Sequence, residues 1–180
     1  MTPTATVESG RRIIRGIASS INEDRHGDIV MPRGLKWGAL PLPLLWQHSH
    51  SDVVGKITEI TATASDVRIV AEVGRGFGRA DEVFAMIREG YAAGLSIGFI
   101  GKKHEANGAR GLKWLEAELL EVSVVSVASN RESRILDATG KAQATKQGEA
   151  VLLLGHPRYE QDRWAKLGHA GAVSLKRATR

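Results

Sequence analysis

The chain has 180 residues, a length that suits one domain. Apolar residues make up 42% and charged residues 25% of it, as in ordinary globular proteins, and its net charge at pH 7 is +5. The absence of cysteine excludes disulfides, thiolate catalysis and cysteine-ligated zinc. No apolar run reaches the roughly 20 residues that cross a bilayer, and the first residues lack a signal-peptide pattern, so we expect a cytoplasmic protein without a membrane span.

Residues 11–19 interleave isoleucines with arginines and predict a first strand. Residues 22–28 follow, and their Asn, Asp and Gly residues are typical of a turn. Three acidic groups and His26 in this segment would also suit a cation, but no spacing fixes a coordination geometry. We favour a hydrogen-bonded turn over a metal site.

An apolar segment, residues 41–46, leads directly into His48 and His50. In an extended conformation Trp46, His48 and His50 would share one face. Such a pair, with Asp52 as a third ligand, has the spacing of a metal site. A histidine at the end of a buried strand is also a candidate general base, and a structural or surface role is the third interpretation. The spacing alone does not separate the three.

Residues 53–61 and 66–73 are rich in Val, Ile and Thr and flank a polar turn, which predicts a β-hairpin. The glycine-rich residues 74–78 lack the lysine and hydroxyl residue of a phosphate-binding loop, and we interpret them as a flexible connector that lines a substrate groove. Residues 79–89 carry apolar side chains at helical spacing and are followed by Gly90, which predicts a helix.

This helix leads to residues 94–99, with the sequence GLSIGF. If the segment is a strand, its three bulky apolar residues face the core, while Ser96 and Gly98 share the other face. No bulky side chain would then crowd the Ser96 hydroxyl. A strand that presents a nucleophile and an ordinary close-packed strand both fit this pattern.

Residues 101–111 are polar, and we expect a mobile connection there. Residues 112–127 form two strand-like runs. The second run is almost without charge, and Glu121 is the exception. A carboxylate beside such an apolar run is costly to bury unless it is paired. Glu121 therefore lies either at a solvated strand end or in a bond to a partner such as an imidazole.

The charge excess lies at the end of the chain. Residues 141–180 hold eight basic against three acidic residues, whereas residues 1–140 hold 17 of each. Residues 129–132 have the composition of a turn that leaves the domain, and residues 141–150 that of a linker. We therefore expect a domain over residues 1–138, followed by a polar linker and basic tail over residues 139–180.

Four blocks of the sequence resemble the prohead (capsid maturation) serine proteases of tailed bacteriophages and of related prophage or gene-transfer particles. They occur in that family's order and spacing. The blocks are residues 16–19 (GIAS) with 24–30 (DRHGDIV), 44–48 (LLWQH), 90–99 ending in GLSIGF, and 120–125 (LEVSVV). Residues 128–131, ASNR, depart from the Pro-Ala-Asn-Pro that is usual in the family.

The resemblance implies a mainly β (α+β) fold, a closed or partly open β-barrel with flanking helices, similar to herpesvirus assembly proteases. It also implies a catalytic Ser-His pair with an acidic third member. Carried over residue by residue, the nucleophile is Ser96, the base is His48 and the third member is Glu121. His50 remains an alternative to Glu121 as the third member, because the related viral enzymes use a second histidine at that place.

In this chemistry His48 takes the proton of Ser96 as its oxygen attacks a carbonyl, and later returns the proton to the leaving amine. Glu121 would hold the useful tautomer of the imidazole. Backbone amides around Ser96, or the cations of Arg75 and Arg79, are candidates to stabilise the oxyanion.

The implied function is cleavage of scaffold, of the amino-terminal segment of the major capsid protein and of the chain itself, inside the procapsid in the bacterial host cytoplasm. We expect no cofactor and no metal, a homo-oligomer such as a dimer, and nucleic-acid contact only through the basic tail. Two other functions stay open. One is a catalytically inactive assembly component of a phage-like particle, with a tail that contacts nucleic acid; the other is a metal hydrolase using His48, His50 and Asp52.

Overall fold

A computed structural model describes residues 10–140. The elements in this part of the chain are β1 (Arg12–Ser20), β2 (Ile29–Val30), the 3-10 helix η1 (Pro32–Gly34), β3 (Leu35–Trp37), β4 (Leu42–Trp46), β5 (Ser49–Ala62), β6 (Asp66–Val73), α1 (Ala80–Arg88), β7 (Gly94–Asn107), β8 (Gly111–Val125) and β9 (Arg134–Thr139). The predicted linker and basic tail lie, from residue 141 onward, outside the described residues. Within these residues, no helix has the length and apolar composition needed to cross a membrane.

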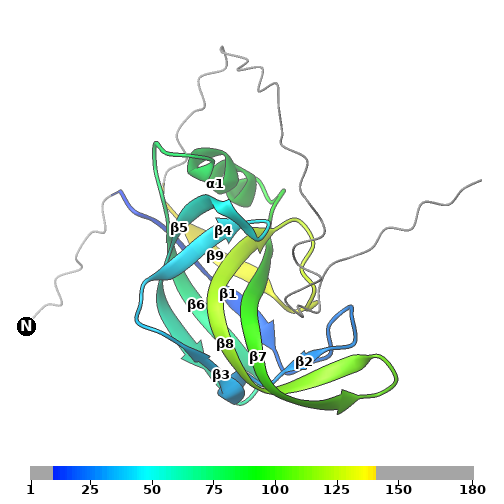
Figure 1. Cartoon of the computed structure of the whole chain (residues 1–180). Coiled ribbons are helices and arrows are strands. Elements are labelled where there is room, and N and C mark those ends of the chain that lie inside the picture. Colours follow the sequence, from blue (N-terminus) through cyan, green and yellow to red (C-terminus); the bar gives the residue numbers. More distant parts are fainter. Residues whose placement is uncertain (1–9, 141–180) are drawn as a thin grey trace, which may run out of the picture. The chain divides into compact units, whose positions relative to one another are not determined.

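Seven strands of the described chain close into a barrel (Figure 1). Neighbouring strands pair in the order β8, β4, β5, β6, β1, β9 and β7, and β7 pairs back with β8. The pairing of β7 with β9 is confined to Gly94 and Arg134, whereas β7 and β8 pair along most of their length. The predicted mainly β fold with a barrel is confirmed, with α1 as the one α-helix among the described residues.

Three predicted elements are confirmed with small shifts at their ends. The strand predicted over residues 11–19 is β1. The hairpin predicted over residues 53–73 is the antiparallel pair β5 and β6, although β5 already begins at Ser49. The helix predicted over residues 79–89 is α1.

Strand β8 is the element on which the site is built. One edge of it pairs in succession with the parallel strands β2, β3 and β4, and the other edge pairs with antiparallel β7. Val122 and Val124 point into the core, and Leu95 of β7 lies opposite Val124. Because side chains alternate along a strand, Glu121 and Ser123 face the outside of the barrel.

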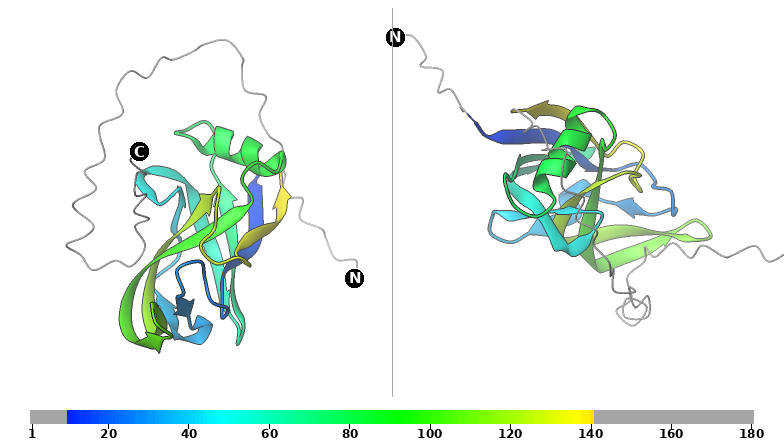
Figure 2. Two further views of the ribbon diagram at one scale, coloured as in Figure 1. Left: turned by 90° about the vertical axis from the view of Figure 1, so that its right-hand side faces the viewer. Right: turned by 90° about the horizontal axis from the view of Figure 1, so that it is seen from above.

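Helix α1 lies across one end of the barrel (Figure 2). The buried residues of this helix are Ala80, Val83, Phe84 and Ile87. The buried guanidinium of Arg12, on β1, lies over the Phe84 ring at 4.9 Å from its centroid. Arg12 also donates a hydrogen bond to the Asp81 carboxylate. Apolar packing and a charged contact together therefore fix the helix on the barrel.

Three segments differ from the expectations. Residues 101–107, expected as a mobile connection, continue β7 and pair with β8; they are mostly exposed, because this end of the β7–β8 hairpin projects beyond the barrel (Figure 1). Residues 112–125 belong to one strand rather than to two runs. The turn at residues 129–132 does not leave the domain, since β9 follows it and pairs with β1 and β7.

Candidate active site

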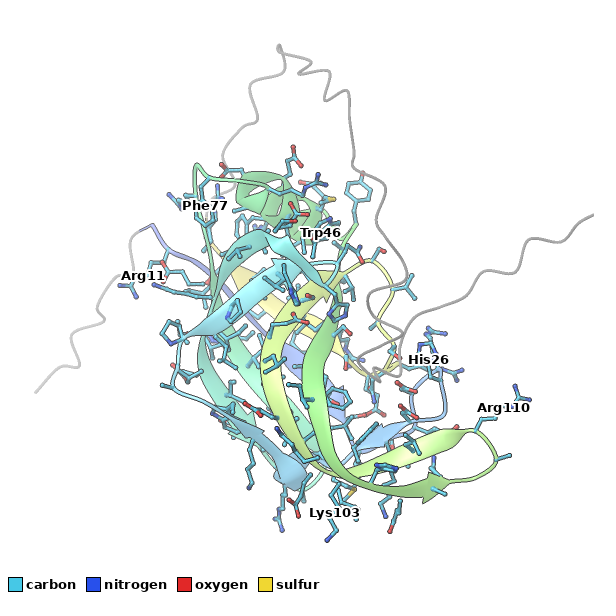
Figure 3. All side chains as sticks on the ribbon, viewed as in Figure 1. Arg11, His26, Trp46, Phe77, Lys103 and Arg110 are labelled. Carbon is cyan, nitrogen blue, oxygen red and sulfur yellow. The ribbon has the colours of Figure 1, made fainter. Side chains whose placement is uncertain are left out.

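His48 lies in the two-residue turn that joins β4 to β5, at the end of the barrel where Figure 3 labels Trp46. Trp46 and Ser49 pair across the turn, and its central residues Gln47 and His48 have φ values of 52° and 58°. Positive φ at both central residues characterises a type I′ hairpin turn, which usually carries Asn or Gly. The chain therefore reverses at His48, and the extended arrangement expected for Trp46, His48 and His50 is wrong.

Two hydrogen bonds hold this turn over β8. The Gln47 N–H donates to the Val124 carbonyl at 3.0 Å and extends the pairing of β4 with β8 by one residue. The next amide, of His48, donates to Ser123 Oγ at 3.1 Å. These bonds hold Gln47 and His48 in the left-handed conformation, which costs a residue other than glycine about 1 to 2 kcal/mol. The imidazole consequently lies over the outer face of β8.

Ser96 lies on β7, directly opposite Ser123 of β8. Its neighbour Leu95 is fully buried, so Ser96 points outward, where it is half-buried. Ser96 Oγ lies 2.8 Å from His48 Nε2. The hydroxyl is therefore accessible at the barrel surface and in hydrogen-bond contact with the imidazole.

Glu121 is opposite Gly98 of β7, and only 5% of its side chain is exposed. Its Oε1 lies 2.6 Å from His48 Nδ1, and its Oε2 accepts a hydrogen bond of 2.7 Å from Ser123 Oγ. A buried carboxylate is tolerated when its oxygens are hydrogen-bonded, and both oxygens have such partners here. Glu121 is therefore hydrogen-bonded to an imidazole and does not lie at a solvated strand end.

Ser96, His48 and Glu121 form one hydrogen-bonded row from hydroxyl to carboxylate. An ionised carboxylate can only accept, so the proton on the Glu121 side belongs to Nδ1, and Nε2 keeps the lone pair that accepts the Ser96 O–H. An imidazole in this tautomer can remove the proton of a hydroxyl that attacks a carbonyl. The arrangement is therefore suited to activate Ser96 as an oxygen nucleophile.

Ser123 is the residue of this site that sequence reasoning missed. It is completely buried, and its hydroxyl contacts both Glu121 and the backbone of His48. In the sequence it looks like one polar position in a valine-rich strand. Its spacing of two residues from Glu121, which puts both side chains on one face of a strand, was the available signal.

The residues of the metal interpretation are not brought together. His50 and Asp52 lie on β5, beyond the turn, and Arg79 Nε lies 3.9 Å from Asp52 Oδ1. Both ring nitrogens of His48 already face the hydroxyl and carboxylate described above. Among residues 10–140 there is no group of three or more His, Cys, Asp or Glu side chains that could hold a metal ion. Of the two candidate third members, Glu121 and not His50 is the one placed at His48 Nδ1.

The loop over residues 22–28 is a hydrogen-bonded turn. Asp24 Oδ1 accepts hydrogen bonds from the N–H groups of His26 and Asp28 at 2.8 and 2.9 Å. Asp24 Oδ2 accepts the Ser129 hydroxyl at 2.7 Å, which ties the loop to the segment after β8. Figure 3 shows His26 beside the β7–β8 hairpin. Asp24 thus serves as an acceptor for backbone N–H groups and a hydroxyl, as expected for a turn.

The two arginines considered for the oxyanion, Arg75 and Arg79, lie in the loop of residues 74–79 that joins β6 to α1. Arg79 is next to Asp52, as described above. Burial alone would raise the pKa of Asp81, but the hydrogen bond from Arg12 and the charge of Arg75 help to hold that pKa below its ordinary value. A role of Arg75 or Arg79 at the oxyanion stays a prediction.

Residues 2–148 match the family described as caudovirus prohead serine protease. The chain is 38% identical over 136 residues to the capsid polyprotein of Pseudomonas phage PAJU2, a match that covers 72% of this chain and 20% of that protein. It is 33% identical over 128 residues to the prohead protease of Escherichia phage T5, covering 67% of this chain and 60% of that protein. The chain thus spans less than two thirds of the length of either relative.

Two solved structures are similar at low sequence identity. One is the KSHV protease in complex with a hexapeptide phosphonate inhibitor, with a TM-score of 0.48 and 11% identity, covering 69% of this chain and 64% of that one. The other is the varicella-zoster virus protease, with a TM-score of 0.45 and 14% identity, covering 69% of this chain and 63% of that one.

Proposed function

The chain belongs to the caudovirus prohead serine protease family, and on that premise we propose that it is a serine endopeptidase of capsid maturation in a phage-like particle. Ser96 is the nucleophile, His48 the general base and Glu121 the carboxylate that orients His48. The observation that carries this proposal is the unbroken row of hydrogen bonds, 2.8 Å from Ser96 Oγ to His48 Nε2 and 2.6 Å from His48 Nδ1 to Glu121 Oε1.

In the first step Ser96 Oγ attacks the carbonyl carbon of the scissile peptide bond, while His48 Nε2 takes the hydroxyl proton. Glu121 stabilises the imidazolium that forms, and its burial strengthens this interaction because little water screens it. His48 then gives the proton to the leaving amine, which departs as the C–N bond breaks. A water molecule, deprotonated by His48 in the same way, then attacks the acyl ester on Ser96; as the ester C–O bond breaks, His48 returns the proton to Ser96 Oγ and the carboxylic product leaves.

The exposure of the reacting groups supports a polypeptide substrate. The His48 side chain is 42% exposed, and Ser96 is half-buried on the outer face of the barrel. The nucleophile can therefore be reached by an extended segment of another protein without entry into an enclosed cavity. This fits an endopeptidase better than an enzyme that surrounds a small molecule.

We assign as substrates the scaffold and the amino-terminal segment of the major capsid protein, together with the chain itself, inside the procapsid within the bacterial host. The family and the names of the two relatives, capsid polyprotein and prohead protease, support capsid proteins as the substrate class. A homo-oligomeric state remains an expectation from the family resemblance.

Incubation of the purified chain with the major capsid protein of its own particle, free and in procapsids, tests the proposal. Wild type is expected to cleave the capsid protein with or without chelator, and Ser96→Ala and His48→Ala are expected to lose this cleavage. Ser51→Ala is the matched control, because Ser51 lies on β5 near the turn and its hydroxyl contacts Ser49 at 3.0 Å.

Each alternative has its own outcome in this experiment. Unchanged cleavage by Ser96→Ala contradicts the serine mechanism. Loss of cleavage with chelator favours a metal hydrolase. A wild-type chain that cleaves neither free nor assembled capsid protein favours the inactive assembly component.

A further inference from the structure

We propose that Ser123 is a positioning residue that holds both the carboxylate of Glu121 and the turn of His48 in their reactive arrangement. This inference rests on the serine mechanism proposed above and adds a residue to it. Ser123 does not touch the reacting atoms; it acts through the two groups that it contacts.

The hydroxyl of Ser123 makes two hydrogen bonds with opposite roles. An ionised carboxylate has no proton to give, so the 2.7 Å contact with Glu121 Oε2 uses the single proton of the Ser123 hydroxyl. The His48 amide is a donor, so its 3.1 Å contact uses a lone pair of the same oxygen. One hydroxyl thereby links a carboxylate of β8 to the backbone of the β4–β5 turn.

The burial of Ser123 makes this link hard to replace. The residue is 0% exposed, so solvent cannot readily supply the lost hydrogen bonds if the hydroxyl is removed. Replacement by alanine would deprive both the Glu121 carboxylate and the His48 amide of their bond to this residue. Both lost bonds involve residues of the hydrogen-bonded row, His48 and Glu121, that must stay aligned with Ser96.

The conformation of the turn increases its dependence on this anchor. Gln47 and His48 both have positive φ, a conformation that persists only where the surroundings enforce it. The Ser123 hydroxyl and the Val124 carbonyl are the acceptors that bind the two turn amides to β8. Without the first of them, the imidazole would have more freedom to leave the line between Ser96 and Glu121.

Labelling of the full chain with a fluorophosphonate, which reacts with activated serine hydroxyls, measures this effect without a known substrate. Loss of a hydrogen bond to a charged group predicts a labelling rate about tenfold to a hundredfold lower in Ser123→Ala. Ser123→Cys leaves no cavity, because a thiol is somewhat larger than a hydroxyl, but it replaces the hydroxyl by a weak donor, so a similar decrease is expected. This second variant separates loss of hydrogen bonding from loss of packing.

Ser133→Ala is the matched control. Ser133 is 3% exposed, and its hydroxyl donates to the Ala18 carbonyl at 2.9 Å, so this variant also loses one buried serine hydrogen bond. It is expected to unfold more easily but to label at the wild-type rate per folded molecule.

A proton NMR signature distinguishes positioning from general stability. The far-downfield resonance of the His48 Nδ1–H, assigned by its absence in His48→Ala, is expected in wild type and Ser133→Ala, and expected to shift or broaden in both Ser123 variants. Wild-type labelling and an unchanged resonance in these variants would overturn the proposal. Labelling that survives Ser96→Ala contradicts the proposed function instead, and the His48 resonance then still decides the role of Ser123.

Discussion

Gly98 of β7 and Glu121 of β8 are paired across the two strands, and the side chain that Gly98 lacks leaves the space that the Glu121 carboxylate fills. A Cβ atom on Gly98 would overlap the carboxylate group. This space allows Glu121 to lie along the outer face of the sheet and reach His48 Nδ1. The glycine is thus required by the carboxylate rather than by its own backbone conformation.

Gly98→Ala is therefore expected to lower the fluorophosphonate labelling rate at least tenfold, by displacing Glu121 from His48. Overpacking of this kind costs roughly 1 to 3 kcal/mol of unfolding free energy, so the folded state should be retained. Gly38→Ala is the control, because a Cβ there meets no atom within 4 Å. Equal labelling rates for the two alanine variants would contradict the importance of this space.

Gln47 is expected to respond to substitution through its backbone conformation. Asn tolerates the left-handed region far better than a β-branched residue, so Gln47→Asn should be about 1 to 2 kcal/mol more stable than Gln47→Val. Both variants alter the hydrogen bond from Gln47 Nε2 to Ser126 Oγ, and their difference therefore reports mainly on φ. Urea unfolding measures it, and equal unfolding free energies would show that the turn is not strained.

The apolar pattern of the sequence was sufficient to predict β5, β6 and α1, because each has one face in the core and one in solvent. The strand over residues 101–107 was missed for the converse reason. That part of the hairpin is mostly exposed, so its sequence lacks the alternation of apolar and polar residues that indicates a strand.

The site could be predicted only in part. The blocks shared with the family pointed to Ser96, His48 and Glu121, but alternation suggested that the chain runs straight through His48. Gln-His is not a usual sequence for a type I′ turn, and the reversal depends on bonds to β8 that are distant in sequence. Ser123 was missed because its role appears only when that turn folds over it.

Asp81 is expected to make folding sensitive to acid. Burial opposes ionisation of this carboxyl, but hydrogen bonds from Arg12 and the Gly76 amide outweigh it and hold its pKa below the ordinary value of 3.8. A pKa lowered by folding contributes stability that is present above the unfolded value and is lost as the pH falls through the folded pKa. Asp81→Asn should therefore be about 1.5 to 3 kcal/mol less stable than wild type at pH 7, and this difference should shrink below pH 3.8. A difference that is constant from neutral to acid pH would exclude this linkage.

Asp24 and Ser129 are expected to show an energetic coupling. Their 2.7 Å hydrogen bond joins the loop over residues 22–28 to the segment after β8. A double-mutant cycle of Asp24→Ala and Ser129→Ala should give a coupling of about 0.5 to 3 kcal/mol in the unfolding free energy. Strictly additive effects would show that the two segments are held together by other contacts.

The proposed serine mechanism is tested most directly by finding which residue a fluorophosphonate modifies. The labelled wild-type chain would be digested and the modified residue identified by mass spectrometry, in parallel with His48→Ala. We expect the phosphonyl group on Ser96, with little modification when His48 is absent. A chain that cleaves its capsid protein but carries the label on another serine, or on none, would contradict the mechanism.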